Sequence, residues 1–137
     1  MPRVNGILET ALYVKDVQSA AAFYRRVFGF NPLLESDRLV ALDVAGKSVL
    51  LLFKQGATAG NYTTPGGVIP GHDGSGVTHF AFAIAADELP AWRDHFKRLG
   101  VPIESTVTWN GGAVSLYVRD EDQNLVELIT PGFWRTY

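Results

Sequence analysis

An internal repeat constrains the fold of this 137-residue chain more than any other feature: the order strand–helix–strand–strand–strand occurs twice. Short apolar runs and apolar stripes of helical period predict these elements. In the first half they are a strand over 7–14, a helix over 17–28 and strands over 31–35, 38–44 and 48–53. In the second half they are a strand over 77–84, a helix over 88–99 and strands over 103–109, 113–119 and 125–130. The repeat predicts an α+β fold of two tandem βαβββ modules, pseudo-twofold in arrangement, whose sheets face each other across a shared cavity.

The two halves also align residue by residue. Residues 8–14 align with 78–84, and 49–52 align with 125–128. In this alignment Glu9 and His79 hold the same position of the repeat, and Glu127 holds the position of Leu51. We therefore expect four symmetry-related positions around the cavity, three of them occupied by side chains that can bind a metal.

Capping residues and turn residues fix the ends of several elements. Asp16 and Asp87 are placed to cap the N-termini of the two helices, and Gly29 and Gly100 are placed to end them. Two further signals concern the strands. Pro32 indicates that the strand over 31–35 lies at a sheet edge, and the pair Asn110-Gly111 predicts a hairpin turn.

The segment 54–76 interrupts the repeat. Seven of its residues are glycine, and it also holds Pro65 and Pro70. It is too long for an ordinary connection, so it is either a tether between the modules or a lid over a functional site. We expect one domain over 1–137, with module 1 at about 6–53, this connecting loop, and module 2 at about 77–131.

Composition excludes several classes of function. The chain has no cysteine, so a metal site must use histidine and carboxylate ligands. The net charge is −2 and there is no basic run, so neither nucleic acid nor an anionic membrane is an expected partner. No apolar run is long enough to span a bilayer, and the first residues do not resemble a signal peptide. We expect a cytoplasmic protein.

Glu127 poses the main chemical question. It lies in the middle of the strand over 125–130, whose two faces are both largely apolar. A buried carboxylate costs several kcal/mol unless a cation or hydrogen bonds compensate it. Glu9, His79 and Glu127 together would suit a divalent ion such as Fe, Mn, Ni, Co or Zn, with further coordination positions open. The alternative is a metal-free protein in which the carboxylates pair with arginine or with hydrogen-bond donors.

Four stretches of the sequence carry a family resemblance. They are Leu12-Tyr13-Val14-Lys15-Asp16-Val17, Phe23-Tyr24 with Phe28-Gly29-Phe30, Gly76-Val77-Thr78-His79-Phe80-Ala81-Phe82, and Leu116-Tyr117-Val118-Arg119-Asp120-Glu121-Asp122-Gln123-Asn124-Leu125-Val126-Glu127-Leu128. With them the chain resembles the vicinal oxygen chelate superfamily, which includes the glyoxalase I, bleomycin-resistance and extradiol-dioxygenase families. The resemblance implies paired βαβββ modules, a homodimer, and metal ligands at Glu9, His79 and Glu127. In such families the metal binds or polarises adjacent oxygens of a small-molecule substrate.

The chain departs from the family pattern at three places. Leu51 stands where glyoxalase I-like members carry a fourth ligand. Glu9 stands where extradiol dioxygenases and fosfomycin-resistance thiol transferases carry histidine. Glu121 and Gln123 replace the proline and glycine that the family favours in the last turn, which bears on strain in that turn.

Four further residues are candidates for contact with a substrate. Ser115 and Tyr117 share one strand face, which in the family often looks into the cavity. Tyr117 would there donate to a substrate oxygen, or else it is a buried tyrosine satisfied by the backbone. Trp109 either lines the cavity or caps the sheet edge, and His72 is either a solvated loop residue or a lid residue that meets the substrate.

Two functional hypotheses remain. The first is a metal-dependent enzyme, a lyase, isomerase or dioxygenase, in which a metal-bound carboxylate (Glu9 or Glu127) can also leave the metal and act as a base. The second is a metal-free binding protein for a small molecule, as bleomycin-resistance proteins are. The two hypotheses differ in metal content, which can be measured directly.

Overall fold

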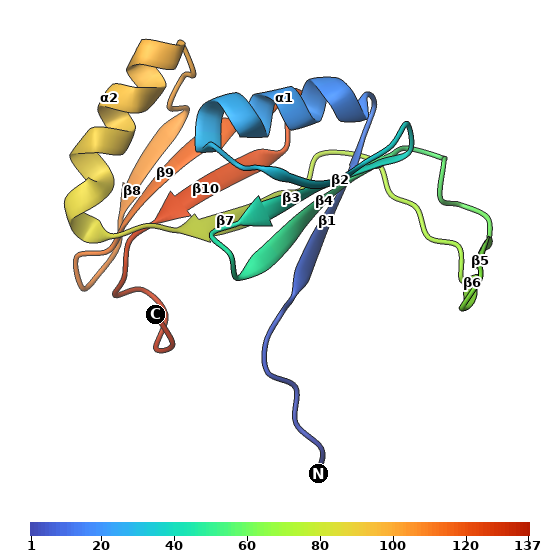
Figure 1. Ribbon diagram of the computed structural model, residues 1–137. Helices are drawn as coiled ribbons and strands as arrows, with labels where there is room; N and C mark the ends of the chain where they lie inside the picture. The colour runs from blue at the N-terminus through green and yellow to red at the C-terminus, as the bar shows by residue number, and fades with distance from the viewer. The chain divides into compact units, whose positions relative to one another are not determined.

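The protein is described by a computed structural model that covers residues 1–137 and divides into two compact units. Unit 1 comprises Met1–Gly76 and unit 2 comprises Val77–Tyr137 (Figure 1). The connecting segment therefore belongs to unit 1. None of the helices is both long enough and apolar enough to cross a membrane.

Unit 1 contains a four-stranded sheet and one long helix. Its elements are β1 (Glu9–Val14), α1 (Val17–Phe28), β2 (Pro32–Glu35), β3 (Leu39–Val44), β4 (Ser48–Lys54), β5 (Tyr62–Thr64) and β6 (Gly67–Ile69). The sheet order is β1-β4-β3-β2, with β1 parallel to β4 and the other pairs antiparallel. The edge position predicted for β2 from Pro32 is confirmed.

Unit 2 repeats this topology. Its elements are β7 (His79–Ala83), a 3₁₀ turn (Ala86–Glu88), α2 (Leu89–Leu99), β8 (Ser105–Thr108), β9 (Val114–Arg119) and β10 (Leu125–Ile129). The sheet order is β7-β10-β9-β8, again with the first pair parallel. The predicted βαβββ repeat is confirmed. The hairpin predicted at Asn110-Gly111 joins β8 to β9, where Gly111 and Gly112 both have positive φ angles.

The strand registers confirm the predicted alignment of the two halves. In unit 1, Glu9 pairs with Val49, so Leu51 lies two residues further along β4. In unit 2, His79 pairs with Leu125, so Glu127 lies two residues further along β10. Glu9 and His79 are therefore equivalent by position, and so are Leu51 and Glu127.

The helix ends agree with the sequence at three of the four predicted positions. The Asp16 carboxylate accepts a hydrogen bond from the Ser19 backbone N–H at 2.7 Å, and Gly29 and Gly100 end their helices in the left-handed conformation. The cap predicted at Asp87 is wrong. Residues Ala86–Glu88 are wound into a 3₁₀ turn ahead of α2, so Asp87 lies inside a helical turn and not at an extended capping position.

The connecting segment contains a structure that was not predicted, the β5–β6 hairpin. The hairpin turns at Pro65-Gly66, a strong turn pair between two short β-forming runs, so the signal was present in the sequence. The remainder of the segment is tied to itself. The His72 N–H donates to the Thr58 carbonyl at 2.8 Å, and the Gly56 N–H donates to the Asp73 carboxylate at 3.0 Å.

The cores of the units use one face of each strand. In unit 1 the buried side chains on the core face of the strands are Leu12, Val14, Val40, Leu42, Leu50 and Leu52, and α1 packs against β3 and β4. In unit 2 they include Leu116, Val118, Val126 and Leu128. Because side chains alternate along a strand, the opposite faces carry Glu9 and Leu51 in unit 1 and His79, Tyr117 and Glu127 in unit 2. The candidate functional residues therefore lie on the face of each sheet opposite to its core.

Candidate functional site

The Glu127 carboxylate is almost completely buried, with 7% of the residue exposed. Its Oε1 atom accepts two hydrogen bonds from the neighbouring strand β9. The Ser115 hydroxyl donates one of them, and the Tyr117 hydroxyl donates the other at 3.2 Å. The register places Tyr117 directly opposite Glu127, and Ser115 opposite Ile129. Two hydroxyl donors therefore compensate one of the two carboxylate oxygens.

The surroundings keep these donors in place. The Trp109 indole N–H donates to the Ser115 hydroxyl oxygen at 2.8 Å, which leaves the Ser115 proton for Glu127. Burial raises the pKa of the Tyr117 phenol, and the negative charge and hydrogen bond of Glu127 raise it further, against an opposing effect of Ser115. Tyr117 is therefore protonated at neutral pH and acts as a donor.

His79 contacts the other oxygen of the carboxylate. Its Nε2 atom lies 3.3 Å from Oε2 of Glu127, and its Nδ1 atom lies 3.0 Å from the Leu125 backbone carbonyl. A carbonyl only accepts hydrogen bonds, so Nδ1 carries a proton and donates it to Leu125. If the imidazole is neutral, Nε2 presents a lone pair to a carboxylate oxygen, which is repulsive. A proton or a metal ion is therefore needed between the two groups.

The turn before β10 positions His79, and sequence reasoning missed this role. The Asn124 side-chain oxygen accepts hydrogen bonds from both the backbone N–H and the hydroxyl of Thr78, the residue before His79. The Asn124 amide in turn donates to the Asp120 carboxylate at 3.0 Å, and both residues are buried. The sequence does show a polar turn directly before an apolar strand. A turn alone, however, does not indicate which neighbouring strand its side chains bind.

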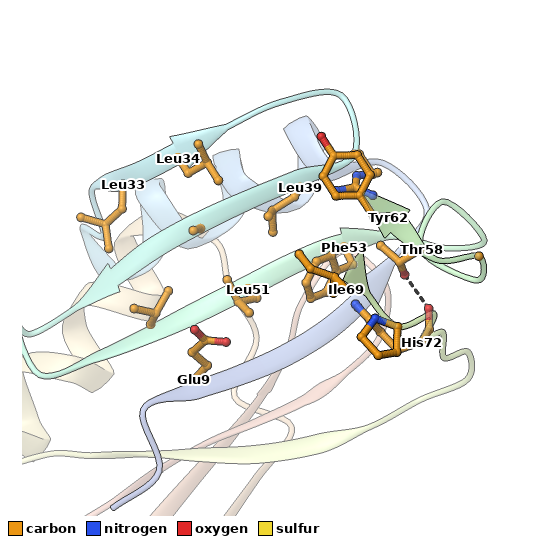
Figure 2. Close-up of a pocket in the computed structure, with 15 residues that line it drawn as sticks. Glu9, Leu33, Leu34, Leu39, Leu51, Phe53, Thr58, Tyr62, Ile69 and His72 are labelled. Carbon is orange, nitrogen blue, oxygen red and sulfur yellow. Dashed lines mark hydrogen bonds between the residues drawn. The ribbon is translucent and has the colours of Figure 1, made fainter. Parts of the chain in front are cut away.

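The other two predicted residues, Glu9 and His72, lie in unit 1. They line a cavity of about 480 Å³ on the face of the sheet that carries Leu51 (Figure 2). The Tyr13 hydroxyl is 2.6 Å from Nδ1 of His72, and the His72 ring packs against Phe53 with ring centroids 4.7 Å apart. His72 is thus held in place and is not a freely solvated loop residue. No local sequence pattern indicated its pairing with Tyr13, which is a contact across 59 residues.

The structure brings together five of the seven predicted site residues, all in unit 2: Trp109, Ser115, Tyr117, His79 and Glu127. The hydroxyls of Ser115 and Tyr117 both donate to Glu127. The alternative in which the backbone satisfies the Tyr117 hydroxyl therefore does not describe this contact. Within neither unit do three or more histidine, aspartate or glutamate side chains gather closely enough to hold a metal ion. The proposed third ligand, Glu9, stays a prediction.

The chemistry of the His79–Glu127 pair nevertheless fits a divalent metal ion. A ligating histidine commonly donates its other ring N–H to a backbone carbonyl, as His79 does to Leu125. A ligating carboxylate is commonly hydrogen-bonded as well, as Glu127 is through Oε1. These contacts occupy Nδ1 of His79 and Oε1 of Glu127. They leave Nε2 of His79 and Oε2 of Glu127 directed at each other.

Comparisons with known proteins agree with this fold. A sequence model of the Glyoxalase/Bleomycin resistance protein/Dioxygenase superfamily matches residues 6–128. The crystal structure of a lactoylglutathione lyase from Agrobacterium tumefaciens is 34% identical, covers 98% of this chain and 99% of its own, and superposes with a TM-score of 0.88.

Two curated proteins are also similar. A metallothiol transferase, FosB, of Bacillus licheniformis is 26% identical over 129 residues, which are 93% of this chain and 77% of that protein. A catechol-2,3-dioxygenase of Bacillus subtilis is 31% identical over 121 residues, which are 85% of this chain but only 38% of that protein. These relatives are named for different chemistries. The chain belongs to the Glyoxalase/Bleomycin resistance protein/Dioxygenase superfamily.

Proposed function

We propose that this chain is a divalent-metal-dependent enzyme that acts on a small molecule with two adjacent metal-binding oxygens. The observation that carries the proposal is the buried Glu127 carboxylate, whose Oε2 lies 3.3 Å from Nε2 of His79. This arrangement needs a proton or a metal ion between the two groups. Relatives named as a metallothiol transferase and a dioxygenase support a metal over a proton.

His79 and Glu127 would hold the metal from unit 2, with Glu9 as a third ligand from unit 1 of the same chain or of a second copy. The support for Glu9 is its equivalence to His79 in the strand register. Fe, Mn, Ni, Co and Zn all accept such nitrogen and carboxylate ligands. When bound, the ion would act as a Lewis acid toward the substrate oxygens, or as a site of O₂ chemistry if it is Fe(II).

The residues of the chain then have distinct roles. Ser115 and Tyr117 fix the Glu127 carboxylate through Oε1, and Trp109 fixes Ser115. Glu9 and Glu127 are the candidate bases, since a carboxylate can accept a proton from carbon beside a polarised oxygen. Tyr117 is neutral and can transfer its hydrogen bond to a substrate oxygen. His72 is a candidate for substrate contact from the connecting segment.

The test is metal content. Protein purified without a chelating tag should carry one divalent ion per chain, and Glu127→Gln should lose it while staying folded. The glutamine keeps an acceptor for Ser115 and Tyr117 but removes the charge that binds the cation. Glu121→Gln, an exposed carboxylate in the same unit, is the matched control and should keep full occupancy. Stoichiometric metal in Glu127→Gln would remove the assignment, and Glu9→Gln tests the third ligand in the same assay.

A metal-free binding protein is the second candidate. The observation that favours it is the unit 1 cavity, which has largely apolar walls and a volume typical of small-molecule sites. Wild-type protein without metal that still binds small apolar molecules would support this candidate over the first.

We also propose a homodimer, because β1 and β7 are both unpaired sheet edges and such edges are commonly covered. Sedimentation equilibrium at micromolar concentration measures the mass, and a mass of one chain would contradict the dimer.

A further inference from the structure

The cavity in unit 1 is electrically asymmetric along its length. Glu9 lies at one end, while Tyr62, Thr58 and His72 lie at the other (Figure 2). The Arg38 guanidinium lies over the Tyr62 ring, 3.9 Å from its centroid, and therefore belongs to this second end. The cavity thus has one acidic end and one basic end.

The space between the two ends is apolar. Its walls are formed mainly by Leu33, Leu34, Leu39, Leu51, Phe53 and Ile69. Ile69 and Tyr62 come from the β5–β6 hairpin, so this hairpin is part of the wall. Several of these side chains are exposed in the free chain, including Leu33 and Leu34 at 60% and 55%. An apolar ligand body would remove this surface from water, which favours binding.

Arg38 is a half-buried cation without a carboxylate partner. Arg38 takes part in none of the ion pairs Arg25–Glu35, His79–Glu127 and Arg119–Glu104. Its contact is the aromatic face of Tyr62, which positions the guanidinium but does not neutralise its charge. A guanidinium binds a carboxylate through two parallel hydrogen bonds, so an anionic ligand group is its natural partner.

The strand register gives the separation of Glu9 and Arg38 along the sheet. Glu9 pairs with Val49 of β4, and the Arg38 carbonyl accepts a hydrogen bond from the Lys54 N–H at the far end of that strand. The five steps along the strand from Val49 to Lys54 span roughly 17 Å. Both ends of a short arylalkyl chain fit within this distance.

We infer that the unit 1 cavity binds an amphipathic monocarboxylate, with its apolar body along β3 and β4 and its carboxylate on Arg38. Without a metal ion, Glu9 repels a second negative group at the opposite end, which fixes the orientation of the ligand. If the monocarboxylate is the substrate of the enzyme, the inference rests on the proposed function. Binding of the monocarboxylate to the cavity does not itself need the metal.

The test uses phenylhexanoate and phenylhexanamide, which share one apolar body and differ in charge. Calorimetry on chelator-treated protein should show the acid binding at least about tenfold tighter than the amide, because a hydrogen bond to a charged group is worth more than a neutral one. Arg38→Met should abolish this ratio, mainly by weakening the binding of the acid. Arg3→Met, an exposed arginine in the N-terminal segment, should keep the ratio.

A second variant tests the apolar wall. Leu34→Gln alters an exposed side chain and should weaken the acid and the amide by the same factor. Equal affinities of acid and amide in the wild type, a ratio that survives Arg38→Met, or no binding of either compound at millimolar concentration would each overturn the inference. Metal content is measured separately on untreated protein, so a failure of the proposed enzyme function is distinguished from a failure of the cavity assignment.

Discussion

Ser115→Ala tests whether the hydroxyl of Ser115 is what compensates the buried Glu127. The substitution removes the direct hydrogen bond to Oε1 and also removes the acceptor of the half-buried Trp109 indole N–H. A hydrogen bond to a charged group contributes about 1.5–3 kcal/mol, and the orphaned indole adds to the loss. We expect a decrease of about 2–3 kcal/mol in the free energy of unfolding.

Urea unfolding followed by tryptophan fluorescence measures this loss, since a lower midpoint at unchanged slope reports a change in stability. Ser105→Ala is the matched control. Ser105 is an exposed serine on the adjacent strand β8, and its substitution should change the stability by less than about 0.5 kcal/mol.

A double-mutant cycle then assigns the energy to the Ser115–Glu127 contact. In the background of Glu127→Gln the acceptor is neutral, so Ser115→Ala should cost about 1 kcal/mol less than in the wild type. If Ser115→Ala costs the same in both backgrounds, or costs no more than Ser105→Ala, the hydroxyl does not compensate the carboxylate and the reasoning about Glu127 is wrong.

Two further predictions concern unit 1 packing and a surface ion pair. Gly74→Ala would place a methyl group 2.5 Å from the Tyr13 ring. We therefore expect the free energy of unfolding to fall by about 1–3 kcal/mol and the melting temperature to fall with it. An unchanged melting temperature would show that the ring moves freely. The hydrogen bond from Arg119 lowers the pKa of Glu104. The pair therefore stabilises the fold at pH values above 4.5, the ordinary pKa of glutamate. This contribution is lost as the pH falls through the lowered pKa. Glu104→Gln should therefore reduce the dependence of the melting temperature on pH in this acidic range, and identical profiles would contradict the pairing.

The sequence by itself determined the repeat and its register. Apolar residues that alternate along a strand allow only one face to enter the core, so aligning the two halves also aligned the side chains of the opposite faces. For this reason the equivalence of Glu9 with His79 and of Leu51 with Glu127 was predicted and is confirmed by the pairings. Glu127 was singled out for the same reason, because a charge in an apolar strand requires compensation.

Only the tertiary structure decided what provides that compensation. Ser115 and Tyr117 were placed on the correct face, but the partner of their hydroxyls depends on the pairing of β9 with β10. Likewise, Arg38 and Tyr62 are separated by the whole of β3 and β4 in the sequence, and they meet because the β5–β6 hairpin returns to the start of β3. Local patterns report which face a side chain occupies. Which side chains meet on that face is set by strand order and by loop conformation, and neither of these is contained in the pattern of any single segment.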